Sequence, residues 1–223
     1  MHASIIEMPL TTPEMTRCLD GMFKLRHEVF KERLNWDVGS FSGRERDQFD
    51  DLDPVYIVCE QDGEVLGSWR LLPTTGPYML RDVFPELLHG APAPAAPDVW
   101  EISRFAVSKR VAGNDSLGTI RAVTQLLLDQ LFTFAARRSL SRIVAVSDVR
   151  FERILKRAGL LTHRFGPPLQ IGVTQAVAGY ADVTTLNLRR LQMVAQGASA
   201  AALPGEREGA SVPVVPPALK LAA

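Results

Sequence analysis

The chain has little cysteine and no long apolar run. Cys18 and Cys59 are the only two cysteines among 223 residues, and each stands alone in an apolar pattern. Two isolated cysteines form neither a disulfide framework nor a metal-binding cluster, so we expect both to be small core residues. No segment reaches the roughly 18 apolar residues that a membrane helix needs. Residues 1–10 also lack the basic start and apolar centre of a signal peptide, and together these features predict a cytoplasmic protein.

An excess of either charge is also missing. Lysine and arginine together number 25, and so do aspartate and glutamate, so the net charge gives no reason to expect a nucleic acid or a membrane as partner. The sequence shows no metal-ligand cluster, no phosphate-binding glycine fingerprint and no paired nucleophile and base. The chain does have apolar content, because 46% of its residues are hydrophobic, and its length allows one substantial core.

Hydrophobic periodicity predicts helices and strands in alternation. Helices are expected over 13–30, 82–88, 116–138 and 149–158, with a last one ending near 194. Strands are expected over 55–59, 65–72, 100–108, 142–147, 169–173 and 176–183. Thr12 and Asp148 are expected to cap helices, and Gly159 is expected to end one. This order, with an early antiparallel hairpin, favours an α/β fold with a mixed sheet.

Two segments have no period. Residues 31–54 are too long and too charged for an ordinary connector, and such a loop inside a compact domain is usually functional or disordered. Its aromatics and paired acids favour a folded, functional loop. Residues 197–223 are rich in alanine, proline and glycine and are expected to be a disordered tail. Residues 1–196 are therefore predicted to form a single domain.

Aromatic and charged side chains occur together in three stretches. The first includes Arg26, Phe30, Trp36, Asp47 and Asp50. The others are GSWRL at 67–71 and WEISRFA at 100–106. Placing charges of both signs among residues that are usually buried costs stability unless the charges pair or take part in chemistry.

The order and spacing of these stretches carry a resemblance. Together with the segments 25–33 (LRHEVFKER), 74–80 (TTGPYML) and 84–90 (FPELLHG), they are similar to the acyl-homoserine-lactone synthases, the bacterial autoinducer synthases, over about 25–178. The resemblance implies a three-layer α-β-α fold with a mixed twisted sheet, acetyltransferase-like (GNAT-related), in which strands 100–108 and 142–147 splay apart. It also implies synthesis of an N-acyl-L-homoserine lactone, a quorum-sensing signal, from S-adenosylmethionine and an acyl-acyl carrier protein, with acyl-CoA as another donor. No cofactor is expected, since S-adenosylmethionine is a consumed substrate.

The implied reaction forms two bonds. The methionyl amine attacks the acyl carbonyl, and the methionyl carboxylate then displaces methylthioadenosine. An α-amine with a pKa near about 7.7–8.0 must first lose a proton, whereas the second step is intramolecular and gains from orientation. The resemblance implies Glu101 as the base, acting through an ordered water, with further catalytic roles for Asp47, Asp50 and Arg70. The residues expected to bind S-adenosylmethionine are Arg26, Phe30, Trp36, Arg104 and Phe105.

Each of these residues also has a structural alternative. Glu101 can pair with an arginine, and the arginines can form a buried network with Glu45, Asp47 and Asp50. Phe30 continues the apolar face of the first helix, and Phe105 resembles a packing residue. Burial explains Trp36 less well, because it lies in a polar loop, and an aromatic face attracts a cation such as a sulfonium.

The spacing of Glu101 and Arg104 constrains the strand that carries them. In a regular strand, residues three apart point to opposite faces. Either the two side chains serve different layers, or a bulge lies between them. We favour the bulge, because bulges beside a cleft commonly aim a side chain and disturb strand pairing.

An apolar tunnel is expected for the acyl chain. Its expected lining is Met79, Ile102, Ala145, Val146, Ser147, Phe151, Ile154, Leu155 and Leu160, all of which could equally be ordinary core. In the family, a threonine in the strand before Ser147 accompanies 3-oxo-acyl substrates. Ala145 stands there instead, so we expect an unsubstituted or 3-hydroxy chain. The bulk of Phe151 predicts medium length, about eight carbons, although one methylene shifts binding by only about 0.8 kcal/mol.

Residues 150–164 form the most basic stretch of the chain, with five cations against Glu152. A solvated helix face is the ordinary explanation. Because the acyl carrier protein is strongly acidic, a docking face also fits. The expected docking residues are Arg150, Arg153, Arg157 and Arg164.

Two other readings remain open at the sequence level. In a GNAT-type N-acetyltransferase using acyl-CoA, Arg110–Gly113 before a helix would bind pyrophosphate, but the glycines that follow are wrongly spaced. A generic acetyltransferase also has no counterpart of the 31–54 loop. A non-catalytic regulator is the other reading, but such a protein need not keep costly charges.

Overall fold

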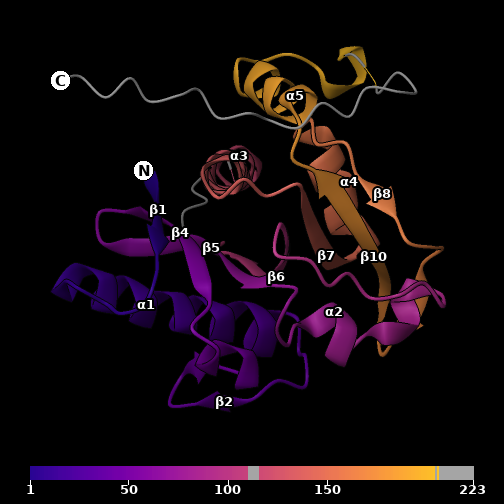
Figure 1. Ribbon diagram of the computed structural model, residues 1–223. Helices are drawn as coiled ribbons and strands as arrows, with labels where there is room; N and C mark the ends of the chain where they lie inside the picture. The colour runs from indigo at the N-terminus through magenta and orange to yellow at the C-terminus, as the bar shows by residue number, and fades with distance from the viewer. Residues whose placement is uncertain (110–115, 204, 206–223) are drawn as a thin grey trace, which may run out of the picture.

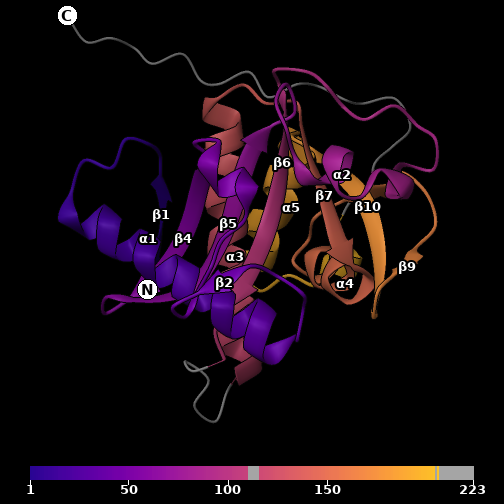
Figure 2. The ribbon, with the colours of Figure 1, turned by 90° about the horizontal axis from the view of Figure 1, so that it is seen from below.

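The computed structural model describes residues 1–109, 116–203 and 205. Its main element is an eight-stranded mixed sheet in the order β1-β4-β5-β6-β7-β10-β8, with β9 paired to β10 off that path (Figures 1 and 2). The strands are β1 His2–Ile6, β4 Val55–Gln61, β5 Glu64–Pro73, β6 Val99–Val107, β7 Arg142–Asp148, β8 His163–Arg164, β9 Leu169–Ile171 and β10 Thr174–Asp182. A separate small hairpin consists of β2 Ser40–Phe41 and β3 Arg44–Glu45.

Helices cover both faces of the sheet, as Figure 1 shows. The helices are α1 Pro13–Arg26, α2 Met79–Asp82, α3 Ser116–Arg137, α4 Val149–Arg157 and α5 Thr185–Ala195. The chain continues from α1 into a π-helix over His27–Arg33, and short 3-10 turns occupy Gln48–Asp51, Pro85–Leu88 and Ala200–Ala202. The apolar side chains of α3, α4 and α5 share one core. The α1 and α2 sides form two further clusters on the opposite face, which confirms the three-layer arrangement.

Several local signals read from the sequence are confirmed. The hydroxyl of Thr12 accepts a hydrogen bond from the backbone N–H of Met15, and the Asp148 carboxylate accepts one from Arg150. Gly159 has φ +98° directly after α4, a conformation that glycine adopts without steric cost. Both cysteines are buried and free.

The helix expected over 82–88 is wrong in its bounds. An α-helical turn already ends at Asp82, and a separate 3-10 turn begins at Pro85. Proline lacks a backbone N–H and disfavours helical conformation in the residue before it, here Phe84. The tail expected from 197 lies mostly outside the described residues.

The sheet splits between β6 and β7. The two strands pair in parallel from Val99–Arg142 to Ile102–Ala145, and this pairing stops there although both strands continue. This is the pair of strands expected to splay. The split lies in the middle of the sheet, beside Ile102 and Ala145.

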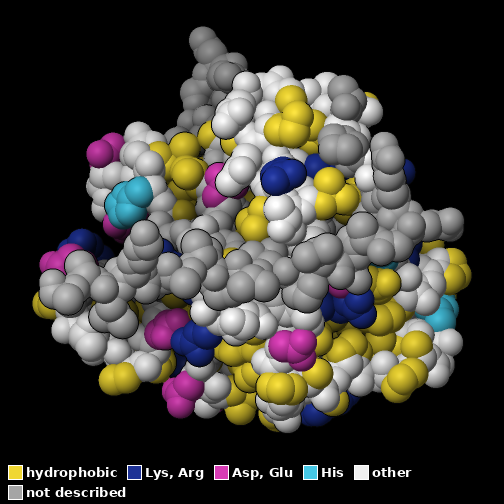
Figure 3. All heavy atoms as spheres, turned by 45° about the horizontal axis from the view of Figure 1, so that its top comes forward, with side chains coloured by type: hydrophobic (Ala, Val, Ile, Leu, Met, Phe, Trp, Pro, Cys, Tyr) yellow, Lys and Arg dark blue, Asp and Glu magenta, His cyan; other side chains and the backbone are white. Residues whose placement is uncertain are grey.

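On the face around α5, charged side chains are few and scattered. Figure 3, which brings the α5 side forward, shows basic and acidic side chains in ones and twos among apolar and neutral ones. No helix in the described part of the chain is long and apolar enough to cross a membrane.

Candidate active site

A bulge in β6 aims the charged residues. Arg70 of β5 lies opposite Ser103, and Ser68 lies opposite Ala106. Two residues of β6, Arg104 and Phe105, therefore lie opposite the single β5 residue Trp69. The first of the two, Arg104, has φ +55°, a left-handed conformation that is uncommon outside glycine. Its guanidinium approaches the Met79 sulfur at 3.4 Å, and the Met79 N–H donates to Glu101 at 3.0 Å. A bulge is present, as expected, but it consists of Arg104 and Phe105 and does not lie between Glu101 and Arg104; it brings Arg104 to the face of Glu101.

Arg26 lies at the buried end of an ion-pair network. Arg26 is the last residue of α1, and its side chain is fully buried. It donates two hydrogen bonds to the Asp50 carboxylate, at 2.8 Å each, and another to Glu45. The Asp50 carboxylate accepts a further bond from the Tyr56 hydroxyl at 2.8 Å. Burial alone would raise the pKa of the Asp50 carboxyl, but hydrogen bonds from Arg26 and the charges of Arg26 and Arg70 bring this pKa well below its ordinary value.

Arg70 and Arg104 complete the network. Arg70 donates to Asp50 at 3.0 Å and also to Asp47. Arg104 contacts Asp47 at 2.6 Å and donates to Glu45 at 3.1 Å. The network thus pairs three arginines with three acids, and most of it comes from α1, the 31–54 loop, β5 and β6. The buried network considered from the sequence is therefore present, and within it Asp50 holds the side chains of Arg26 and Arg70 in place.

The network meets solvent at one place. The side chains of Arg104 and Asp47 are each 11% exposed, whereas those of Arg26, Arg70 and Asp50 are fully buried. Beside this opening, Phe30 and Trp36 stack with ring centroids 5.2 Å apart and planes 3° apart. The guanidinium carbon of Arg104 lies over the Phe30 ring, 5.7 Å from its centroid. The opening therefore combines a cation, an anion and an aromatic wall.

Glu101 is buried next to this network. Its carboxylate accepts the backbone N–H groups of Met79 at 3.0 Å and Leu80 at 2.7 Å, at the start of α2. Within the described chain these two N–H groups, rather than an arginine, hydrogen bond the Glu101 carboxylate, so the arginine pairing considered from the sequence does not form there. Burial raises the pKa of Glu101 to about 7, against the opposing influence of the two N–H groups, Arg70 and Arg104. A carboxyl with this pKa can exchange a proton near neutral pH.

Phe105 lies on the other face of the sheet. Its ring packs 5.2 Å from Trp69 and 4.1 Å from Phe151, among the side chains of α3 and α4. The expectation that it shares a pocket with Phe30 and Trp36 is not met, because the bulge turns Arg104 to one face and leaves Phe105 on the other. It is a packing residue near the split.

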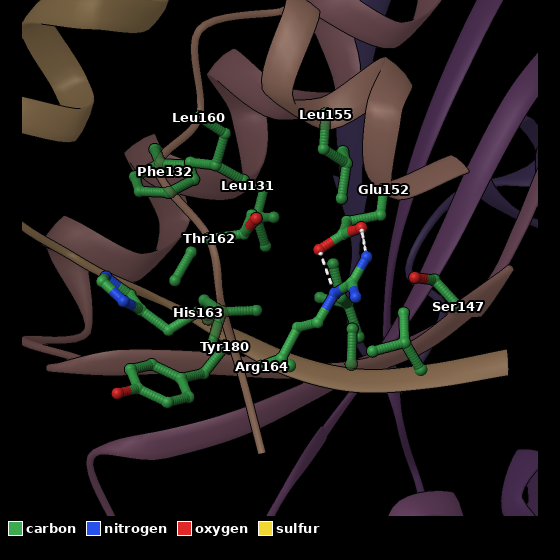
Figure 4. Close-up of a pocket in the computed structure, with 16 residues that line it drawn as sticks. Leu131, Phe132, Ser147, Glu152, Leu155, Leu160, Thr162, His163, Arg164 and Tyr180 are labelled. Atoms are coloured by element: carbon green, nitrogen blue, oxygen red, sulfur yellow. Dashed lines mark hydrogen bonds and ion pairs between the residues drawn. The ribbon is translucent and has the colours of Figure 1, made fainter. Parts of the chain in front are cut away.

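A mostly apolar pocket lies under α4, on the face that Phe105 reaches (Figure 4). Five of the expected acyl-chain residues line it: Ile102, Ala145, Ser147, Leu155 and Leu160. The lining also includes Thr162, Gly179 and Tyr180, which sequence reasoning missed, and Arg164, which was expected only in carrier docking. They come from β8, β10 and the segment before β8, and β8 is too short to show a period. The cavity measures about 40 Å³, which is room for only about three water molecules.

Four expected lining residues do not border this pocket. Val146 alternates to the opposite face of β7, where it packs in the α2-side cluster, and Met79 lies in that cluster too. Ile154 is 37% exposed on the outer side of α4. Phe151 packs against Phe105. The pattern of alternation in β7 explains Val146, whereas the other three depend on tertiary packing.

The basic stretch has two parts. Arg150, Arg153 and Arg157 are exposed on α4. Arg164, in contrast, donates to Glu152 through two nitrogens, the closer contact at 2.5 Å, and Lys156 pairs with the same carboxylate at 3.0 Å. Hydrogen bonds from Arg164 lower the pKa of Glu152 to about 2. Arg164 is therefore a wall of the pocket as well as a surface cation.

The remaining site expectations concern metals and phosphate. Within the described ranges, no group of His, Cys, Asp and Glu side chains could hold a metal ion. The segment Arg110–Gly113, considered for pyrophosphate, lies outside the described residues.

Comparisons with known proteins agree on one family. A family model described as autoinducer synthase matches residues 11–191. An acyl-homoserine-lactone synthase of Pseudomonas aeruginosa is 44% identical over 165 residues, covering 73% of this chain and 81% of that protein. The crystal structure of the AHL synthase LasI has a TM-score of 0.75 at 38% identity and covers 92% of this chain and 98% of its own.

Two further solved structures are similar to this chain in fold. BjaI, a CoA-dependent acyl-homoserine lactone synthase solved with SAM and isopentyl-CoA, has a TM-score of 0.71 at 28% identity, covering 80% of this chain and 82% of its own. A structure named as an N-acetyltransferase from Lactobacillus plantarum, 17% identical with a TM-score of 0.52, is similar in fold alone. The chain therefore has an acetyltransferase-like α/β fold, belongs to the autoinducer synthase family and is an acyltransferase, an acyl-homoserine-lactone synthase.

Proposed function

We propose that the enzyme makes an N-acyl-L-homoserine lactone from S-adenosylmethionine and an acyl-acyl carrier protein. The amine of S-adenosylmethionine attacks the thioester carbonyl, the carbon–sulfur bond breaks, and the carrier thiol leaves. The carboxylate of the acylated product then attacks its own γ-carbon, the carbon–sulfonium bond breaks, and methylthioadenosine leaves. The proposed acyl chain is of medium length and is unsubstituted or 3-hydroxylated.

The opening of the charged network supports the site for S-adenosylmethionine. Arg104, the network arginine that reaches solvent, is placed to bind the substrate carboxylate, because a planar guanidinium suits a carboxylate. The stacked Phe30 and Trp36 offer an aromatic face for the sulfonium. Asp47, also partly exposed, adds a negative charge on the same side. Arg26, Arg70 and Asp50 hold these groups in position.

Glu101 carries the proposal. It is buried beside the split between β6 and β7, and its pKa of about 7 suits a base that takes a proton from an ammonium whose own pKa is near about 7.7–8.0. An ordered water relays the proton. Past Ile102, no β7 residue pairs with β6 in the described chain, so backbone N–H groups along that edge are available to the thioester oxygen.

The acyl chain is proposed to pass from the split into the pocket under α4. Ile102 and Ala145 form the last pair before the split and also line the pocket. Ala145 offers no hydroxyl for a 3-oxo group. Because the cavity holds only about three waters, side chains such as Leu155 must move when the chain enters.

The carrier protein is the proposed donor because Arg150, Arg153 and Arg157 give α4 an exposed basic face. BjaI, at 28% identity, is CoA-dependent, so CoA thioesters are the comparison to make. Mass spectrometry of medium from cells expressing the chain tests the proposal. We expect an N-acyl-homoserine lactone whose mass gives the acyl length and the oxidation state at C3. An acylated amine without a lactone ring would overturn it.

A further inference from the structure

The floor of the pocket under α4 is built from small residues. Across the sheet, Ala145 pairs with Gly179, which pairs with Arg164. Two residues along, on the same face of the sheet, Ile143 pairs with Ala181, and Thr162 precedes β8 beside that pair. A Cβ on Gly179 would lie 2.5 Å from the His163 carbonyl oxygen, so this position cannot carry a larger side chain without a shift. The pocket therefore reaches from β6 over β7 and β10 to β8.

The charged groups in its wall are already engaged. The Glu152 carboxylate takes hydrogen bonds from Arg164 and an ion pair from Lys156. Figure 4 shows this pair as a bridge between α4 and β8 at one side of the pocket. A ligand that broke the pair would leave the buried Glu152 carboxylate with the Lys156 ion pair alone, which costs stability. These residues are thus a fixed wall and offer no free contact.

Thr162 is different. Its hydroxyl oxygen is buried and has no protein hydrogen-bond partner, and the only other such side-chain atom among the described residues is the Ser68 hydroxyl. Thr162 lines the pocket and Ser68 does not. In Figure 4 the Thr162 oxygen lies on the side of Leu131 and Glu152, where the pocket is lined by α3 and α4. A buried hydroxyl of this kind destabilises the fold unless something bonds it, and an all-carbon acyl tail cannot do so.

We propose that Thr162 determines specificity by hydrogen bonding an oxygen near the far end of the acyl chain. The inference rests on the proposed function, since it assumes that the acyl chain fills this pocket. Ser147 lies by the split, and Thr162 lies about 13 Å along the strands and about 10 Å across them, from the rise and spacing of a sheet. The oxygen is therefore remote from the thioester and distinct from any hydroxyl at C3. The preferred acyl group carries a terminal or near-terminal hydroxyl.

The test uses matched pairs of acyl thioesters, unsubstituted and ω-hydroxylated, from eight to sixteen carbons, because the diagonal from Ser147 to Thr162 is longer than an extended eight-carbon chain. For each pair, kcat/KM for lactone formation is measured with the wild type and with Thr162→Val, which keeps the shape and removes the hydroxyl. We expect the wild type to prefer one hydroxylated donor by about tenfold, the usual value of one neutral hydrogen bond. Thr162→Val should erase that preference, and Thr162→Ser should keep it. Ser68→Ala, which removes the other unpartnered hydroxyl, should leave the ratio unchanged.

Two results would overturn the inference. One is a wild type without preference for any hydroxylated donor, which needs no variant to fold. The other is a ratio unchanged by Thr162→Val, as expected if a water or a backbone carbonyl bonds the hydroxyl. Both differ from failure of the proposed function, in which the wild type forms no lactone from any of the donors.

Discussion

Glu101 shows at the residue scale how burial and function are connected. Its pKa of about 7 exceeds that of an exposed glutamate because the folded protein removes the carboxylate from water. The folded state therefore binds the proton more tightly than the unfolded state does. The associated stability is fully present below about pH 4.5 and is lost as the pH rises through about 7.

Replacing Glu101 by glutamine removes this titration. Relative to the wild type, the free energy of unfolding of Glu101→Gln should therefore rise between pH 4.5 and 7.5, by up to about 3 kcal/mol. Urea unfolding at a series of pH values measures it. Turnover should fall at least a hundredfold, because general base catalysis commonly contributes about 10² or more. A constant difference in stability across this range would contradict the burial argument, and full activity would reject the base.

Asp50 gives a second prediction at this scale. Asp50→Ala leaves Arg26 and Arg70 with an uncompensated buried charge, so we expect a loss of about 3–5 kcal/mol in the free energy of unfolding. Asp51→Ala is the matched control, because its carboxylate is 74% exposed and pairs only at the surface with Arg46. That control should cost less than about 1 kcal/mol. Equal losses in both variants, measured by urea unfolding, would show that the network does not stabilise the fold.

Residue-level prediction from the sequence succeeded where spacing carried information. The odd spacing of Glu101 and Arg104 predicted a bulge in β6, and the mixture of charges predicted the network. The N–H groups of Met79 and Leu80 at Glu101 were not predictable, because α2 is only four residues long and has no period. Phe105 was misplaced because the bulge also changes the face of every residue after it.

At the scale of elements, α4 connects the pocket to the surface. Its inner side bears Glu152 and Leu155, and its outer side bears Arg153 and Arg157. The helix itself was predictable from its Asp148 cap and from Gly159. Its pairing of Glu152 with Arg164 was not, because that contact joins residues on two separate elements.

Charge reversal on α4 tests carrier docking. Arg153→Glu with Arg157→Glu should raise the KM for the acyl carrier protein about tenfold or more and leave the KM for S-adenosylmethionine unchanged, because rim charges steer acidic partners. The effect should weaken as salt increases. Arg17→Glu, an exposed position on α1 on the opposite face, should change neither constant. Steady-state kinetics that show the same carrier KM in all three proteins would count against docking here.

For the whole molecule, the alternating pattern was enough to predict a mixed sheet between two helical layers. The strand order was not available from periodicity, and the splayed pair came from the resemblance. The 31–54 loop was predicted to be folded, and its acids were named either as catalytic residues or as partners of the arginines, with no geometry. Its contribution of Glu45, Asp47 and Asp50 to one network depends on long-range contacts with α1 and β5 that no local pattern encodes.

The central claim is that one active site acylates S-adenosylmethionine and then closes the lactone. Its most direct test incubates purified protein with S-adenosylmethionine and an octanoyl carrier protein, and quantifies products by mass spectrometry. We predict one methylthioadenosine for each N-octanoyl-homoserine lactone, with both lost in Glu101→Gln. Carrier thiol released without methylthioadenosine, or no lactone with any acyl thioester, would contradict it.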